Sequence, residues 1–122
     1  MDNETIATAL RIAECLSAPD HNVEAEIVGR YVVVRGDRSG VFCGTIVSED
    51  EQTVELTDCR HIWYWSGAAN VAEMALRGVS KPADCKFIAP VQRLRVLDAI
   101  EVVDCTDTAE ESLRAVSEWS KA

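Results

Sequence analysis

The sequence predicts an α+β fold: a small bent antiparallel sheet, SH3-like or a partly open barrel, with an N-terminal helix, a short helix after an aromatic strand and a C-terminal helix. Short runs rich in β-branched and aromatic residues follow one another between turn residues. Helical periodicity is found near both ends of the chain and after Ser66. The length of 122 residues suits one domain with a real hydrophobic core.

Residues 3–16 are predicted to form an amphipathic helix, because Ile6, Leu10, Ala13 and Leu16 recur at helical spacing. The breaker residues at 17–22 end this helix. We therefore divide the chain into an N-terminal helix with its linker, residues 1–22, and a single α+β ligand-binding domain, residues 23–122.

The elements of the domain follow from its local patterns. Strands are expected at residues 30–35, 41–47, 53–56 and 62–65, with an acidic hairpin turn at 48–51. A short helix is expected at 68–77, with Ser66 as its N-cap and Gly78 after its last turn. Residues 89–103 favour strands that are bent or broken near Asp98, and Thr106 or Thr108 begins the final helix.

The charge is unevenly distributed along the chain. The formal net charge of −9 argues against a general binder of long nucleic acids. Residues 59–95 nevertheless carry six bases against two acids. A local cationic patch on an acidic protein suits a small anionic ligand, and the alternative is that these charges are scattered over solvated faces.

The composition also indicates in which cellular compartment the protein is found. The five cysteines are odd in number and form no C-x-x-C pair, which indicates reduced thiols rather than disulfides or a zinc site. No apolar run approaches the roughly 20 residues of a membrane span. The acidic N-terminus lacks the features of a signal peptide. We therefore expect a soluble, cytoplasmic protein with no membrane partner.

The aromatic stretch at residues 60–70 is the strongest candidate for a functional site. In a strand, Trp63 and Trp65 point to one face, and Ile62 and Tyr64 point to the other. If the second pair faces the core, two indoles line a surface on which nucleobases can stack. The alternative is that the tryptophans fill the core or a subunit interface.

Neighbouring polar residues extend this candidate site. The N–H groups at the start of the following helix suit phosphate, and Arg60, Arg38 or Lys86 would complete a phosphate clamp. The turn at residues 38–40 is either an anion-binding nest or a plain hairpin turn. The full set of candidate ligand-binding residues is Arg38, Ser39, Arg60, Trp63, Tyr64, Trp65, Ser66, Gly67, Asn70 and Lys86.

The sequence does not indicate an enzyme. Asp58, His61 and Ser66 are the residue types of a hydrolase triad, but nothing enforces their geometry and no G-x-S-x-G motif is present. Two histidines without an H-x-x-E-H pattern do not indicate a metal centre. We expect a binding protein without catalytic residues, metal or cofactor.

The run from Arg60 to Ala69 resembles the R-x-L-W-Y-W-S-G-A signature of a family of small phage-encoded proteins of unknown function. Residues 33–35, 38–44, 85–91 and 106–119 are also similar to that family, so the resemblance covers about residues 28–119. This sequence departs from the pattern at residues 35–37 and at Ile62, where leucine is usual.

This family is similar to phage anti-CBASS sponge proteins, and the resemblance implies a function. It implies a homo-oligomer, dimer or tetramer, that sequesters a cyclic oligonucleotide defence signal, such as a cyclic dinucleotide, without cleaving it. The compartment it implies is the cytoplasm of an infected bacterial host cell. The alternative is an interaction module whose aromatic stretch is a protein–protein interface, because tryptophan, tyrosine and arginine are also typical interface residues.

Overall fold

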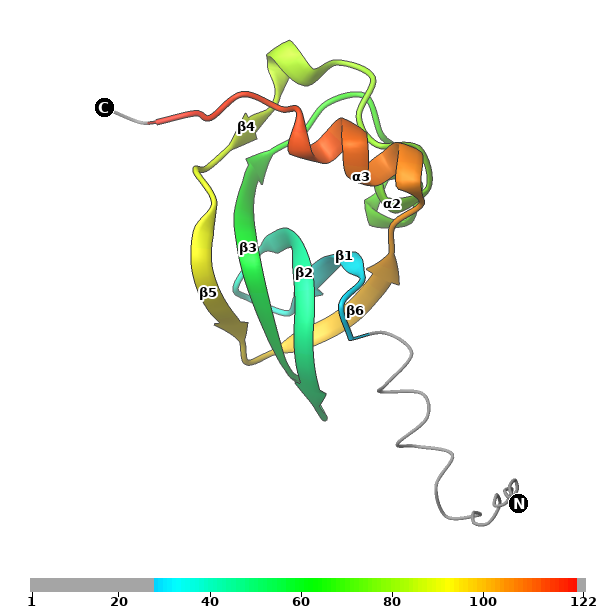
Figure 1. Ribbon diagram of the computed structural model, residues 1–122. Coiled ribbons are helices and arrows are strands. Elements are labelled where there is room, and N and C mark those ends of the chain that lie inside the picture. Colours follow the sequence, from blue (N-terminus) through cyan, green and yellow to red (C-terminus); the bar gives the residue numbers. More distant parts are fainter. Residues whose placement is uncertain (1–27, 121–122) are drawn as a thin grey trace, which may run out of the picture.

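Six antiparallel strands make one strongly bent, open sheet, and two helices lie together beside it in the computed structural model, which describes residues 28–120 (Figure 1). The elements are β1 (Tyr31–Gly36), β2 (Val41–Asp50), β3 (Thr53–Tyr64), α2 (Val71–Arg77), the 3₁₀ turn η1 (Pro82–Asp84), β4 (Lys86–Phe87), β5 (Val91–Val96), β6 (Ala99–Asp104) and α3 (Asp107–Arg114). The predicted α+β class is confirmed. The expected helix at residues 3–16 and its linker lie outside the described residues.

Strand β3 is the centre of the sheet. The order is β4-β3-β2-β1-β6, and β5 pairs with the same edge of β3 as β4 does. Strand β4 pairs near the end of β3, where Tyr64 is the partner of Lys86, and β5 pairs near its start, where Val54 is the partner of Val96. Because β3 pairs with three other strands, its backbone is held firmly in place. The side chains at its end, Trp63 and Tyr64, therefore start from a fixed position.

The length of β3 differs from the prediction of two separate strands at residues 53–56 and 62–65. Pairing with β2 continues without a loop, because a bulge near Asp58 absorbs an extra residue. Asp58 has a φ of 52°, which marks the local kink. Strand β2 likewise extends to Asp50, so the expected four-residue acidic turn reduces to Glu51 and Gln52.

Strand β1 is buried on both of its faces, which explains its unbroken run of valines. Val32 and Val34 point into the bent sheet, together with Ile46 and Leu56. Val33 points the other way, into a second cluster between the sheet and the helices. That second cluster, built around Met74, Phe87 and Leu113, lies beneath the candidate site.

Helix α2 begins later than predicted, because its N-cap is Asn70 rather than Ser66. The Asn70 Oδ1 atom accepts a hydrogen bond of 2.8 Å from the Glu73 N–H. The Glu73 carboxylate in turn accepts one of 2.6 Å from the Ala69 N–H, which makes a reciprocal cap. Gly78, with a φ of 80°, ends the helix at the expected place.

Helix α3 begins at the first of the two predicted positions. The Thr106 hydroxyl accepts from the Ala109 N–H at 3.0 Å and donates to the Leu76 carbonyl at 2.8 Å, so the cap of α3 also joins it to α2. Leu113 and Val116 are buried. Among the described residues, no helix is long and apolar enough to cross a membrane.

Candidate functional site

A row of rings leads from the core to the surface at the end of β3. Phe42 stacks on His61 with ring centroids 4.7 Å apart, and His61 meets Trp63 edge-on at 6.4 Å. Trp63 then stacks on Trp119 at 6.0 Å, with an angle of 22° between the rings. The Lys86 ammonium lies 5.2 Å from the centroid of Trp119. We call Trp63 and Trp119 the aromatic shelf.

The C-terminal segment brings Trp119 to this place. After α3 the chain runs beside β4, where Glu118 forms a parallel bridge with Phe87. The Trp119 N–H donates to the Phe87 carbonyl at 2.8 Å. The candidate residues named from the sequence omit Trp119, and the only signal for it was that it is the third tryptophan of a chain with few aromatics.

A pocket of about 370 Å³ lies beside the shelf. This volume falls within the roughly 300–1,000 Å³ of typical small-molecule sites. Its walls combine two indoles, short apolar side chains and one carboxylate, and the lining residues are Trp63, Ile88, Ala89, Glu118, Trp119 and Ser120. Trp63 is 58% exposed, so part of its indole surface is accessible to a planar ligand.

The structure separates Trp63 from Trp65, which were expected to line one surface. Strand β3 ends at Tyr64, and its register with β4 shifts between Ile62 and Tyr64, so the alternation of faces does not continue. Of the pair that would face the core in a regular strand, Ile62 is buried, whereas Tyr64 is 53% exposed. Trp65 is half-buried, and its Nε1–H donates to the Ala68 carbonyl at 3.1 Å. It lines a different pocket.

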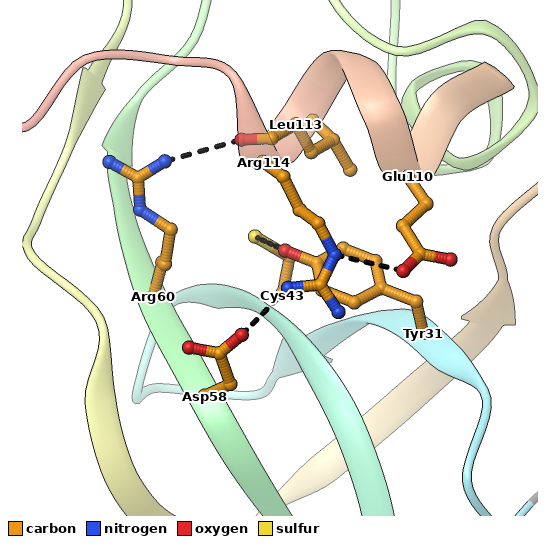
Figure 2. Close-up of polar contacts among 7 residues, drawn as sticks. All are labelled: Tyr31, Cys43, Asp58, Arg60, Glu110, Leu113 and Arg114. Atoms are coloured by element: carbon orange, nitrogen blue, oxygen red, sulfur yellow. Dashed lines mark hydrogen bonds and ion pairs between the residues drawn. The ribbon is translucent and has the colours of Figure 1, made fainter. Parts of the chain in front are cut away.

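Arg60 is an internal structural residue, which corrects the expectation that it binds phosphate. Only 4% of it is exposed. Its guanidinium donates to the carbonyls of Val116 at 2.7 Å, Leu113 at 3.2 Å, Ile88 at 2.9 Å and Phe87 at 3.4 Å. Figure 2 shows the side chain reaching from β3 toward the end of α3. Four backbone acceptors thus take up most of its donors.

The turn at residues 38–40 is an anion-binding nest, but its anion belongs to the protein. The N–H groups of Arg38 and Ser39 donate to Asp98 Oδ2 at 2.8 and 3.2 Å. The Ser39 hydroxyl donates to Asp98 Oδ1 at 2.6 Å. These bonds, that of the Ser39 hydroxyl first, lower the pKa of Asp98. The N–H groups of Arg38 and Ser39 and the Ser39 hydroxyl are therefore occupied by an internal contact to the β5–β6 turn, whereas Arg38 itself is exposed.

The candidate residues between β3 and α2 make hydrogen bonds that stabilise the loop in which they lie. The Ser66 N–H donates to Cys85 Sγ at 3.4 Å, and the Gly67 carbonyl accepts from the Ser80 N–H at 3.2 Å. Asn70 caps α2, so part of the N–H set expected to bind phosphate is already satisfied. These three candidates shape the loop between the shelf and α2.

The predicted cationic patch does not gather around the aromatic stretch. Lys86 lies against the shelf, but Arg60 is buried. Arg93 and Arg95 lie on β5, where Arg93 pairs with Glu55 at 2.8 Å. Among residues 28–120, a ligand at the shelf therefore meets Lys86 rather than a cluster of cations.

A second polar group, shown in Figure 2, joins α3 to the sheet. The Arg114 guanidinium lies over the Tyr31 ring at 4.5 Å and pairs with Asp58 at 2.7 Å and Glu110 at 2.8 Å. The Tyr31 hydroxyl donates to Cys43 Sγ at 3.2 Å. Burial raises the pKa of Tyr31 far above its usual value and that of Cys43 to about 11, so both groups stay protonated.

The three residues that could form a hydrolase triad each contact a different partner. Asp58 pairs with Arg114, His61 stacks on Phe42, and Ser66 lies beside Cys85. Burial lowers the pKa of His61, which favours its neutral form. Within residues 28–120, no three His, Cys, Asp or Glu side chains come together as a set of metal ligands.

A family model matches most of the chain. The model of a domain of unknown function, DUF6948, matches residues 29–113. No curated protein matches the chain significantly. The matched range runs from the residues before β1 to Leu113 in α3, so it includes Trp63 and Lys86 and ends before Trp119. The resemblance to an uncharacterised family is thereby confirmed.

Proposed function

The chain belongs to the DUF6948 family of domains of unknown function, and we propose that it captures a cyclic oligonucleotide, such as a cyclic dinucleotide, without cleaving it. The observation that carries this proposal is the aromatic shelf, an exposed Trp63 stacked on Trp119 beside a pocket of about 370 Å³. Indole faces stack on nucleobases with about 1–3 kcal/mol per base.

The surroundings of the shelf support a ligand that combines a base with a phosphate. Ile88 and Ala89 offer apolar contacts to the edge of a stacked base, and the Glu118 carboxylate accepts hydrogen bonds from its N–H groups. The Lys86 ammonium supplies the positive charge for a phosphate. Within the described part of the chain the cation at the shelf is Lys86, and the protein has a net charge of −9, so the site favours a small ligand over a long nucleic acid.

The biological setting follows from the motif similarity of residues 60–69. It supports a phage origin and a role as a sponge for a cyclic-nucleotide defence signal in the cytoplasm of an infected bacterium. Capture of this kind needs binding residues and no catalytic ones. A homo-oligomer, dimer or tetramer, belongs to the proposal, because the shelf is open and pockets are often completed between subunits.

A second candidate function is an interaction module that binds another protein through the end of β3. The specific observation is that Trp63 and Tyr64 are adjacent and exposed by 58% and 53%. Large aromatic side chains exposed together are typical of interface hot spots.

Calorimetric titration of the full chain against cyclic dinucleotides, cyclic trinucleotides and cyclic ADP-ribose isomers tests the first proposal. We expect one member to bind and to be recovered intact. Trp63→Ala and Trp119→Ala should each weaken binding by about tenfold or more, the loss of one stacked base. Leu97→Ala is the matched control, because Leu97 is 69% exposed and lies outside this pocket.

The outcomes separate the two candidates. If no member binds below roughly millimolar concentration, the capture proposal is wrong. If the ligand is recovered altered, the protein is an enzyme rather than a sponge. If nothing binds and Trp63→Ala or Tyr64→Ala dissociates an oligomer in light scattering, the end of β3 is a protein interface.

A further inference from the structure

A second pocket, of about 380 Å³, lies between the sheet and the start of α2. Its walls come from five separate parts of the chain, and they include Arg35, Val41, Trp65, Ala72 and Glu101. None of these residues lines the pocket beside the aromatic shelf. We call this cavity the Trp65 pocket.

On the floor of the Trp65 pocket, the Arg35 guanidinium lies beside the Glu101 carboxylate. Arg35 is the cross-strand partner of Val41 on β2 and of Glu101 on β6, so these three side chains project from the same face of the sheet. Arg35 Nη1 lies 3.9 Å from Glu101 Oε1, which is an ion pair too long for a hydrogen bond. The two side chains are 56% and 40% exposed. The donors of Arg35 and the acceptors of Glu101 are therefore available to a ligand.

Trp65 supplies one wall. Its Nε1–H is already bonded to the Ala68 carbonyl at 3.1 Å, and its ring packs against the buried cluster beneath the helices. The indole is thus held in place, and what it offers the pocket is ring surface. An aromatic wall of this kind suits a planar ring.

We propose that the Trp65 pocket is a separate binding site for a guanine base. Along its Watson–Crick edge and the neighbouring Hoogsteen edge, guanine presents in order two donors, N2–H and N1–H, and two acceptors, O6 and N7. A carboxylate only accepts hydrogen bonds and a guanidinium only donates them. Glu101 therefore matches the donor pair N2–H and N1–H, and Arg35 matches the acceptor pair O6 and N7. An arginine fork on O6 and N7 is the commonest specific contact to guanine.

The same pair of residues rejects adenine. At the corresponding positions adenine presents an acceptor, N1, a donor, N6–H, and an acceptor, N7. The Glu101 carboxylate therefore meets the N1 lone pair and finds no donor at C2. Hypoxanthine keeps N1–H, O6 and N7 and lacks only the amino group. The pocket should thus rank the bases as guanine, then hypoxanthine, then adenine. This inference does not rest on the proposed function, because the two pockets share no lining residue.

Calorimetric titration of the full chain with GMP, IMP and AMP tests the site. We expect GMP to bind at least about tenfold more tightly than AMP, with IMP between them. This is the discrimination that one good bidentate contact to a base provides. Glu101→Gln and Arg35→Gln should each weaken GMP binding, and Glu101→Gln should also remove most of the preference over AMP. Arg35→Lys keeps the charge but loses the fork, so it should weaken GMP binding while leaving the melting temperature unchanged.

Matched controls make the result specific. Glu111→Gln and Arg95→Gln make the same chemical changes at exposed positions outside the pocket and should leave GMP affinity unchanged. Trp63→Ala should also leave it unchanged, which separates this site from the aromatic shelf. The inference is wrong if GMP does not bind at up to about 10 mM, if GMP and AMP bind equally, or if Trp63→Ala abolishes GMP binding.

Discussion

The Arg60 guanidinium donates a hydrogen bond of 2.7 Å to the Val116 carbonyl and so ties the middle of β3 to the segment that follows α3. Three further carbonyls accept from the same side chain, which is almost completely buried. The segment held in this way leads directly to Trp119. A cation that the sequence suggests for phosphate binding therefore supports the aromatic shelf from beneath.

Arg60→Met should destabilise the protein by about 3 kcal/mol or more, because it leaves several buried carbonyls without a donor. Urea denaturation measures the change, and the equivalent change of exposed Arg95 should stay within about 0.5 kcal/mol. A stable Arg60→Met variant that fails to bind ligand would show instead that Arg60 contacts the ligand.

Gly67→Ala should destabilise the domain more than Gly29→Ala. Both glycines have a positive φ, 93° and 91°, so each alanine meets a similar backbone penalty of about 1–2 kcal/mol. At Gly67 the new Cβ would lie 2.6 Å from the backbone nitrogens of Ser80 and Lys81, whereas at Gly29 it meets nothing within 4 Å. The additional loss should be about 1 kcal/mol or more. Equal unfolding free energies for the two variants would contradict the packing of Gly67 on that loop.

Asp98 should stabilise the fold in a pH-dependent way. Its hydrogen bonds from Ser39 and the Arg38 N–H hold its folded-state pKa below the unfolded value. The unfolded chain therefore takes up a proton first as the pH falls, so this stabilisation is present above about pH 4 and is lost in more acid solution. Asp98→Asn should melt at a lower temperature than the parent at pH 7. The difference should shrink at pH 3, and a constant difference would exclude this role.

His61 should contribute a second, milder dependence on pH. Burial lowers its folded-state pKa, so below about pH 6.5 the unfolded chain binds a proton more readily than the folded one. The parent should lose stability between about pH 6.5 and 5 relative to His61→Phe, a variant that keeps a ring between Phe42 and Trp63. Parallel stability curves across that range would show that His61 does not titrate differently in the two states.

The parts of the fold that depend on local patterns could be predicted from the sequence. The cap at Thr106, the end of α2 at Gly78 and the break near Asp98 all follow from residues close by in the chain. The continuity of β3 could not be predicted. Its two halves are joined across a bulge at Asp58 that is stabilised by pairing with β2, and no local pattern reveals that pairing.

The candidate site was predicted in part, and the errors share one cause. Trp63 and Lys86 do lie together at an exposed surface. Whether an arginine faces solvent or the interior depends on distant partners, and the carbonyls that hold Arg60 come from residues 27 to 56 positions away. Trp119 reaches the site through main-chain bonds to β4, which leave no trace in the pattern of residue types.

The central position of β3 has a consequence for amide hydrogen exchange. A strand paired along both edges releases its N–H groups only when large parts of the sheet open together, so the amides of β3 should be among the slowest to exchange. Within residues 28–120, strand β5 pairs along one edge only, so its amides on the other edge should exchange sooner. The exposed Trp63 ring would then be carried by one of the most protected backbones in the domain, which gives the shelf a rigid base in spite of its exposure.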